Sequence, residues 1–349
     1  FARCRNEGSS LTLNNSYYLQ TIGDAQGNKA YTIIGDEGST VDFYSEPTIT
    51  YSLSGLSFYD AGFKYNNVVY AGSGDTVSLN LDGSDSGYTA VPGELTGDSN
   101  PYTITMGSNN TLIIGGTIDY ITEINSSEDW ITFCQAINDL GHDYSGETVT
   151  LMTDITISTV AAANDTPFRG TFNGNGNTIT LDFGSTSNYL DQRCAPFYRI
   201  GNATIKDVAV DGNIYSSQQN NASLICRVET GTNNYIINCI SSVSIHSDRS
   251  GDGTNGGLVA LLNANNCTVN FEGCAFVGEL IGSSTNNWGG FVGWRDYQNG
   301  NYNYANFTNC FFGPTTVNIS TSSSTNSRTF CRSRDNTTSG ATYTNCYYN

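Results

Sequence analysis

Two short motifs alternate through the C-terminal part of the chain at one nearly constant period. The first is a cysteine-centred tetrad (INCI, EGCA, TNCF and TNCY), and its cysteines lie 35, 36 and 36 residues apart: Cys239, Cys274, Cys310 and Cys346. The second is an apolar tetrad (SLIC, GLVA, GFVG and TFCR), centred on Leu224, Leu258, Phe291 and Phe330. Two interleaved signals with one period indicate a solenoid, in which each repeat stacks on its neighbours.

Half of that period suits one coil of a parallel β-helix. Coils of about 17 or 18 residues, each adding ~4.8 Å by strand hydrogen bonding, predict roughly eleven coils from residue 150 onward and a rod of about 50 Å. Equivalent cysteines would then lie two coils and ~10 Å apart, too far for a disulfide. Small buried thiols are therefore the favoured interpretation of this column, although ten cysteines would also allow five disulfides in an oxidising compartment.

Asparagine precedes three of the four cysteines, at Asn238, Asn309 and Asn345. Asparagine tolerates the left-handed backbone of a tight corner, and its amide can bond an equivalent amide in the next coil. The spacing thus predicts a structural ladder of asparagines beside the cysteines.

One segment has a helical pattern. In NSSEDWITFCQAINDLGHDYSG, Ser126 can cap a helix with Asp129 three residues later, and Gly141 can end it. Apolar residues recur at helical spacing between these signals: Trp130, Phe133, Ile137 and Leu140. The pattern predicts a helix over about 127–140 that covers the open end of the coils.

The chain before this helix divides by pattern into two parts. Residues 1–46 contain β-like runs without a complete pattern, so they form an N-terminal segment that could serve as a linker or an assembly strand. Residues 47–124 contain short β-runs separated by turn residues, which predicts a small Ig-like β-sandwich or β-grasp module. Residues 125–349 form the predicted β-helix with its capping helix.

Charge excludes several classes of partner. Lys and Arg number 14 against 32 Asp and Glu, a formal net charge of −18, and no basic stripe is present, so nucleic acid and anionic lipid are unsuitable partners. No run approaches ~18 consecutive apolar residues, so no direct membrane insertion is expected. The first residues, FARCRNEGSS, indicate a mature secreted protein without its signal peptide, or a fragment lacking it.

Several blocks resemble bacterial surface proteins that carry GLUG-type repeats on a right-handed parallel β-helix. They are SSEDWITFCQAINDLGHDYSGETVTLMTDITI, FRGTFNGNGNTITL, APFYRIGNATIKDVAVDGNI, and the GGLVA and GGFVG tetrads. GDTVSLNL, SGYTAV and NPYTITMGSNNTLIIGGTI are similar to divergent internalin-B repeats. The resemblance implies a secreted, extracellular surface protein concerned with adhesion or envelope architecture, with no catalytic residues. The missing Gly in SLIC and TFCR departs from the pattern.

A cluster of aromatic residues is the strongest candidate for ligand binding. NNWGGFVGWRDYQNGNYNYANF holds rings of the kind that stack on sugars or anchor protein partners: Trp288, Trp294, Tyr297, Tyr302 and Tyr304. The alternative is that some of them pack over a coil edge.

Two groups of residues are candidates for chemistry. Asp207 and Asp211 are the best-placed carboxylate pair for glycoside hydrolysis, but four residues of extended chain span up to ~13 Å, beyond the catalytic distances unless a corner bends them together. Asp248, Asp252 and Asn255 could bind calcium, although their spacing fits no EF-hand. No other cofactor is expected.

These patterns lead to a non-catalytic extracellular structural or adhesive protein with a rigid β-helix. Its partner would be a glycan, a surface protein or further copies of itself. Two alternatives remain: a carbohydrate-binding or polysaccharide-processing β-helix protein, and a filament subunit joined through residues 1–46.

Overall fold

The computed structural model describes residues 120–349 except 232, 264–265, 283, 299–300, 320–326 and 334–339, together with eight strands within residues 1–119. Contacts divide the chain into two compact units, Phe1–Asp119 and Tyr120–Asn349. Each unit is described by itself.

The first unit contains three small sheets among its described residues. β1 (Ser10–Leu13) pairs in parallel with β2 (Thr40–Phe43). Two antiparallel sheets follow, β3 (Leu56–Tyr59), β4 (Gly62–Tyr65) and β5 (Val68–Tyr70), then β6 (Asp75–Asn80), β8 (Thr111–Gly116) and β7 (Thr103–Met106). The expected boundary between residues 46 and 47, and the residues that would distinguish a β-sandwich from a β-grasp module, lie outside the described residues.

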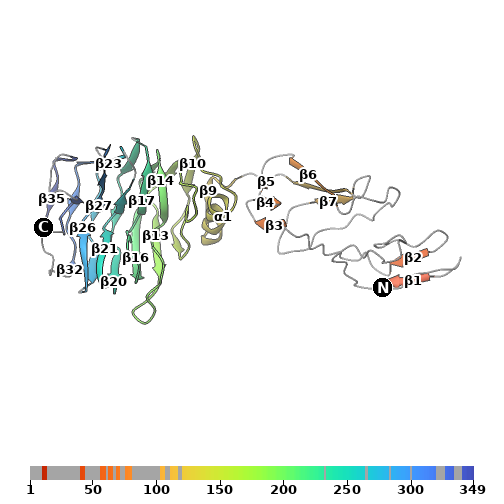
Figure 1. Cartoon of the computed structure of the whole chain (residues 1–349), viewed down its shortest axis with the longest axis horizontal. Helices are drawn as coiled ribbons and strands as arrows, with labels where there is room; N and C mark the ends of the chain where they lie inside the picture. The colour runs from red at the N-terminus through yellow and green to blue at the C-terminus, as the bar shows by residue number, and fades with distance from the viewer. Residues whose placement is uncertain are drawn as a thin grey trace. The chain divides into compact units, whose positions relative to one another are not determined.

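The predicted helix is present as α1 (Ser127–Asn138), and it is the one helix of the described residues. Ser126 is its N-cap, with an extended backbone and a hydroxyl that accepts the Asp129 N–H at 3.1 Å. The apolar side packs on the coils, because the Trp130 ring lies edge-on to Phe172 and Phe197 at centroid distances of 6.0 and 5.7 Å. Figure 1 shows α1 beside β9, at one end of the stacked strands.

The second unit is a parallel β-solenoid (Figure 1). Its first sheet stacks eight strands in one direction: β9 (Glu123–Ile124), β10 (Thr148–Leu151), β12 (Thr171–Asn173), β15 (Thr204–Lys206), β18 (Asn234–Ile237), β23 (Thr268–Glu272), β30 (Tyr304–Thr308) and β34 (Ala341–Thr344). The third sheet stacks five: β14 (Phe197–Gly201), β17 (Ile225–Thr230), β22 (Val259–Leu262), β27 (Val292–Arg295) and β33 (Cys331–Ser333).

The second sheet lies between these two along the chain of each coil. It begins with β11 (Ile155–Ile157), β13 (Thr178–Phe183) and β16 (Ala209–Ser216). Later coils contribute two short strands each, β19 (Ile240–Ser241) with β20 (Ser244–Ser247), β24 (Ala275–Phe276) with β25 (Glu279–Gly282), and β31 (Phe311–Phe312) with β32 (Thr316–Ile319), before β35 (Tyr347–Tyr348). β21 (Gly251–Gly256) pairs in parallel with β26 (Thr285–Gly289), and β28 (Tyr297–Gln298) forms a hairpin with β29 (Asn301–Tyr302).

The register corrects the predicted coil length. Ile236 pairs with Phe271, and Phe271 pairs with Phe307, so the later coils take 35 or 36 residues and not 17 or 18. The solenoid therefore has about five turns rather than eleven. The prediction is wrong because the two motifs of one period do not belong to successive coils. They lie on different sides of the same coil, one beside the second sheet and the other at the start of the third.

Glycines of the apolar tetrads are required by close packing between coils. A Cβ on Gly257 would lie 1.9 Å from the carbonyl oxygen of Gly290, and a Cβ on Gly290 would lie 1.7 Å from that of Thr329. In the first of these repeats Ser223 occupies the corresponding place, and its hydroxyl donates to the Gly257 carbonyl at 2.5 Å. The GG pairs of GGLVA and GGFVG thus allow the corners of neighbouring coils to approach each other.

The core consists of columns of equivalent residues. Phe271 stacks on Phe307 at 4.8 Å and nearly parallel, and Phe307 stacks on Tyr343 at 5.2 Å. The apolar tetrads form another column, because the N–H groups of Leu224, Leu258 and Phe291 each donate to the equivalent residue of the next coil. Residues one sequence period apart therefore contact each other in neighbouring coils.

Candidate functional site

The structure separates the predicted aromatic cluster. Trp288 is buried, with 1% of its surface exposed, and its indole N–H donates to the Thr285 carbonyl at 3.1 Å. Trp294 is half-buried, and the Arg332 guanidinium covers its ring at 4.1 Å. Tyr297 and Tyr302 occupy paired backbone positions of the β28–β29 hairpin, while Tyr304 begins β30 and is 42% exposed. Trp288 therefore has no free face for a ligand, and the Trp294 ring is already stacked.

The three residues considered for calcium have different environments. Asp248 is exposed, and Asp252 accepts the N–H and hydroxyl of Thr254 at 3.1 and 2.8 Å. Asn255 is fully buried, where its amide oxygen accepts the N–H and side-chain amide of Asn221 at 3.0 and 3.2 Å. Among the described residues, no group of three His, Cys, Asp or Glu side chains could hold a metal ion.

The cysteine column lies in successive coils. The residues that follow Cys274, Cys310 and Cys346 show this register. The N–H groups of Ala275, Phe311 and Tyr347 each donate, at 2.9 Å, to the carbonyl of the cysteine in the preceding coil. The cysteines are thus one coil apart, ~4.8 Å rather than the predicted ~10 Å. All four are free thiols, and hydrogen bonding to Cys239 together with burial raises the pKa of Cys274.

The residues before these cysteines form a column of corners with left-handed backbone. Asn238, Asn309 and Asn345 have φ of 51°, 55° and 50°, and Gly273 takes the remaining position with φ of 63°. The Asn345 side-chain amide donates to that of Asn309 at 3.3 Å, and the Asn238 amide donates to Asp207 at 3.1 Å. The side-chain ladder is interrupted at Gly273, which has no amide.

Asp207 and Asp211 are both engaged with neighbours. Asp207 occupies a left-handed corner with φ of 55° and lies 3.4 Å from the Lys206 ammonium. Asp211, in β16, accepts the Ser242 hydroxyl at 2.8 Å. These partners hold the two carboxylates as parts of the coil framework.

A depression of about 440 Å³ lies where α1 meets the first coils, within the range of small-ligand sites. Four segments contribute to it: the end of α1, the segment after β11, the segment before β14, and β14 itself. Its lining residues are Asn138, Ser158, Thr159, Val160, Ala163, Gln192, Arg193 and Tyr198.

The floor of this depression is a small apolar cluster outside the main core. Tyr198, Ala195 and Cys226 are buried together, and Val160 packs against them. Burial raises the pKa of the Cys226 thiol well above its usual range, so this thiol is neutral at physiological pH.

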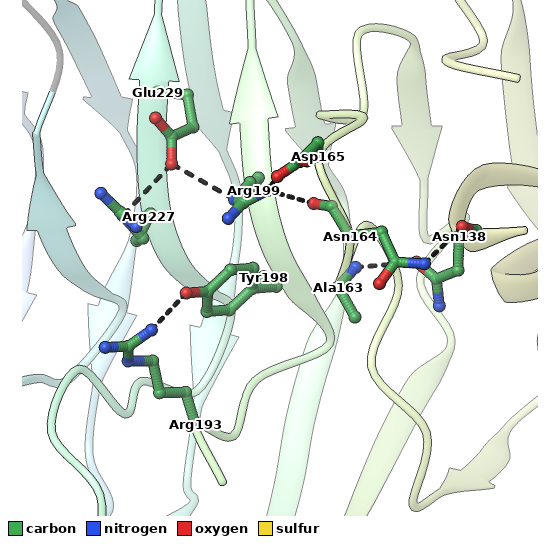
Figure 2. Close-up of polar contacts among 9 residues, drawn as sticks. All are labelled: Asn138, Ala163, Asn164, Asp165, Arg193, Tyr198, Arg199, Arg227 and Glu229. Atoms are coloured by element: carbon green, nitrogen blue, oxygen red, sulfur yellow. Dashed lines mark hydrogen bonds and ion pairs between the residues drawn. The ribbon is translucent and has the colours of Figure 1, made fainter. Parts of the chain in front are cut away.

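The rim is fixed by the last residue of α1. The Asn138 amide donates to the Val160 carbonyl at 3.0 Å. It also accepts the Ala163 N–H at 2.7 Å, and the Asn164 amide donates to the Asn138 carbonyl at 2.5 Å (Figure 2). Trp130 adds a bond from its indole N–H to the Thr159 carbonyl at 2.8 Å. Helix and loop thus form one rigid wall.

An arginine–carboxylate network lies beside the depression on the third sheet. Arg199 and Arg227 occupy paired positions of β14 and β17, and Glu229 lies 3.3 and 3.2 Å from their Nε atoms (Figure 2). Arg199 also donates to Asp165 at 2.9 Å. The Arg199 guanidinium lies 4.9 Å from the Tyr198 ring centre, a cation–π contact that holds the ring in place.

Arg193 differs from these arginines because no carboxylate partners it among the described residues. One guanidinium N–H donates to the Tyr198 hydroxyl (Figure 2), but the Nε is shielded from solvent and has no hydrogen-bond partner. An unsatisfied buried donor of this kind costs about 1–3 kcal/mol. The depression therefore contains a guanidinium that no carboxylate of the described residues neutralises.

Sequence reasoning missed this site. Its residues come from positions 138, 158–163 and 192–198, which only coil stacking brings together. A weak signal was present in DQRCAPFYRIG, where two arginines and a tyrosine fall close together in a chain poor in basic residues.

Comparisons with protein-family models, curated protein sequences and solved structures find no match to this chain. The likeness to GLUG-type and internalin-B repeats therefore stays a prediction from sequence. No helix among the described residues has the length and hydropathy to cross a bilayer.

Proposed function

We propose that the protein is a non-catalytic extracellular surface protein that uses its solenoid as a stiff adhesive or structural scaffold. The observation that carries this proposal is the unbroken register of the first sheet, in which eight parallel strands stack from β9 to β34. Each coil bonds to its neighbours along the whole stack, so the solenoid resists bending. A stiff, acidic rod suits presentation of a binding surface away from a cell envelope.

Glycans are the favoured partner, and the depression beside α1 supports this choice. It combines polar side chains and a guanidinium over an apolar floor, the mixture found in sites for small polar ligands. Polysaccharide processing remains the second candidate. It has weaker support, since Asp207 and Asp211 are both bonded within the coils.

Two measurements test the proposal. The 349-residue chain, labelled with a fluorophore, is applied to a glycan array, and bound glycans are then incubated with the protein and assayed for new reducing ends and unsaturated products. Binding without product formation is expected. Product formation would support the polysaccharide-processing alternative, and failure to bind any glycan would contradict adhesion through glycans.

Antibody labelling of intact source cells tests the surface location. Labelling that occurs only in permeabilised cells would contradict it.

A further inference from the structure

Arg193 is the basic residue that lines the depression. Four other basic residues of the solenoid, Arg169, Arg199, Lys206 and Arg227, each lie within 3.4 Å of a carboxylate. Arg193 has no carboxylate partner among the described residues, although the chain contains 32 Asp and Glu. A guanidinium has five N–H donors, and the described residues accept only one of those on Arg193. The remaining capacity suits an anionic ligand with two acceptor atoms, as a carboxylate has.

The polar groups around Arg193 narrow the ligand class. Ser158, Thr159 and Gln192 line the same depression, and the Gln192 side chain also hydrogen-bonds the Cys194 thiol. Two hydroxyls and an amide can each donate and accept, which suits the hydroxyl groups of a sugar. Val160, Ala163 and the Tyr198 ring supply a small apolar surface, which suits the face of a sugar ring better than an extended apolar ligand.

The net charge of the protein favours a ligand with a single negative charge over a polyanion. At −18, the protein repels polyanions at long range, and the depression offers one unpaired guanidinium rather than a basic stripe. A single carboxylate on a small polar ligand satisfies Arg193 at short range without bringing further negative charge to the surface.

We propose that the depression formed by α1, the segment after β11 and the segment before β14 binds a carboxylated sugar residue, with Arg193 holding the carboxylate and Ser158, Thr159 and Gln192 holding ring hydroxyls. This inference rests on the proposed glycan-binding function and names its ligand class. Tyr198 is a positioning residue, because its hydroxyl accepts from Arg193 and its ring contacts Arg199.

Ligand-observed NMR and calorimetry on the 349-residue chain test the proposal. The probes are methyl β-D-glucuronide and methyl β-D-galacturonide, with methyl β-D-glucoside as the neutral match and N-acetylglutamate amide as an acidic peptide-like match. At least one uronide should bind at least about tenfold more tightly than the glucoside, the selectivity expected of a charge-assisted contact. Arg193→Gln should remove that selectivity.

Two further variants separate binding from folding. Arg249→Gln is the matched control, because the Arg249 Nε donates to the Asp252 carbonyl in a loop that does not line the depression. It should bind the uronide as the parent does. Ser158→Trp fills the depression from an exposed rim position and leaves Arg193 intact, so it should abolish uronide binding in a protein with unchanged circular dichroism.

Three results overturn the proposal: neither uronide binding more tightly than the glucoside, equal or tighter binding of N-acetylglutamate amide, or uronide binding that survives both Arg193→Gln and Ser158→Trp. The array measurement keeps this inference apart from the proposed function. Glycan binding by the array that persists in Arg193→Gln would leave the adhesive function standing while the uronate site fails. Uronide binding by a protein that binds no glycan on the array would support the uronate site and contradict the adhesive function.

Discussion

At the scale of single residues, burial makes most of the thiols unreactive. Burial raises the pKa of Cys194 and of Cys267 to about 12, and that of Cys134 well above its usual range. The thiolate is the reactive form, so these groups resist alkylation at neutral pH. Cys346, at the end of its column, is more exposed than the cysteines of preceding coils.

Iodoacetamide should therefore distinguish the cysteines of the folded chain. At pH 7.5, peptide mass spectrometry is expected to find Cys346 modified long before Cys239, Cys274 and Cys310, and all of them modified in urea. Equal rates for the four residues in buffer would contradict the buried column.

The histidines predict the sign of one pH effect. Burial lowers the pKa of His246, whose ring stacks on Tyr215 at 4.2 Å, and the nearby Glu279 carboxylate opposes that shift only in part. The unfolded chain therefore takes up a proton more readily, and folding stability falls as pH drops below the usual imidazole pKa of about 6.5. Urea unfolding should show a lower midpoint at pH 5.5 than at pH 7.5. His246→Gln should reduce this difference without removing it, since burial also lowers the pKa of His142. An unchanged pH dependence in His246→Gln contradicts the assignment.

At the scale of strands, the aromatic column should carry much of the stability of the later coils. Phe307 in β30 is 1% exposed and stacks between Phe271 and Tyr343. Phe307→Ala removes both stacking contacts and leaves a cavity, which should lower the free energy of unfolding by about 3–5 kcal/mol. Tyr347→Ala is the matched control at a position 67% exposed, with an expected change of about 0.5 kcal/mol or less. Urea denaturation followed by circular dichroism measures both, and similar losses would contradict the assigned core.

The same elements show what sequence could predict. α1 was predicted because its signals are local: Ser126 caps Asp129, and Trp130, Phe133 and Ile137 recur at helical spacing. The parallel solenoid was predicted because identical coils must repeat their inward residues. Coil length could not be predicted, because a one-dimensional period does not reveal how many sides one coil has. The depression could not be predicted either, since hydrogen-bond register between coils, a non-local property, places Asn138 near Arg193.

At the scale of the solenoid, stability should depend on nearest neighbours, because each coil contacts only the coils beside it. Aromatic packing is dense where α1 meets the first coils, with Trp130, Phe133, Phe168, Phe172 and Phe197 in mutual contact. At the other end of the described stack, β34 and β35 expose most of their side chains. Amide exchange should therefore be slowest in the middle coils and fastest in β34 and β35.

Trp130→Ala tests whether this coupling is local. Removing the indole deletes the packing of α1 on Phe172 and Phe197 and the hydrogen bond to the Thr159 carbonyl, so amides of β10 and β12 should exchange faster. Amides of β30, several coils away, should keep their parent rates under conditions where local opening precedes global unfolding, because no contact links them to Trp130 directly. Hydrogen–deuterium exchange read by mass spectrometry gives both rates in one experiment. A uniform acceleration from β10 to β34 would mean that the coils unfold as one cooperative unit, and a stack held together by neighbours alone could not behave in that way.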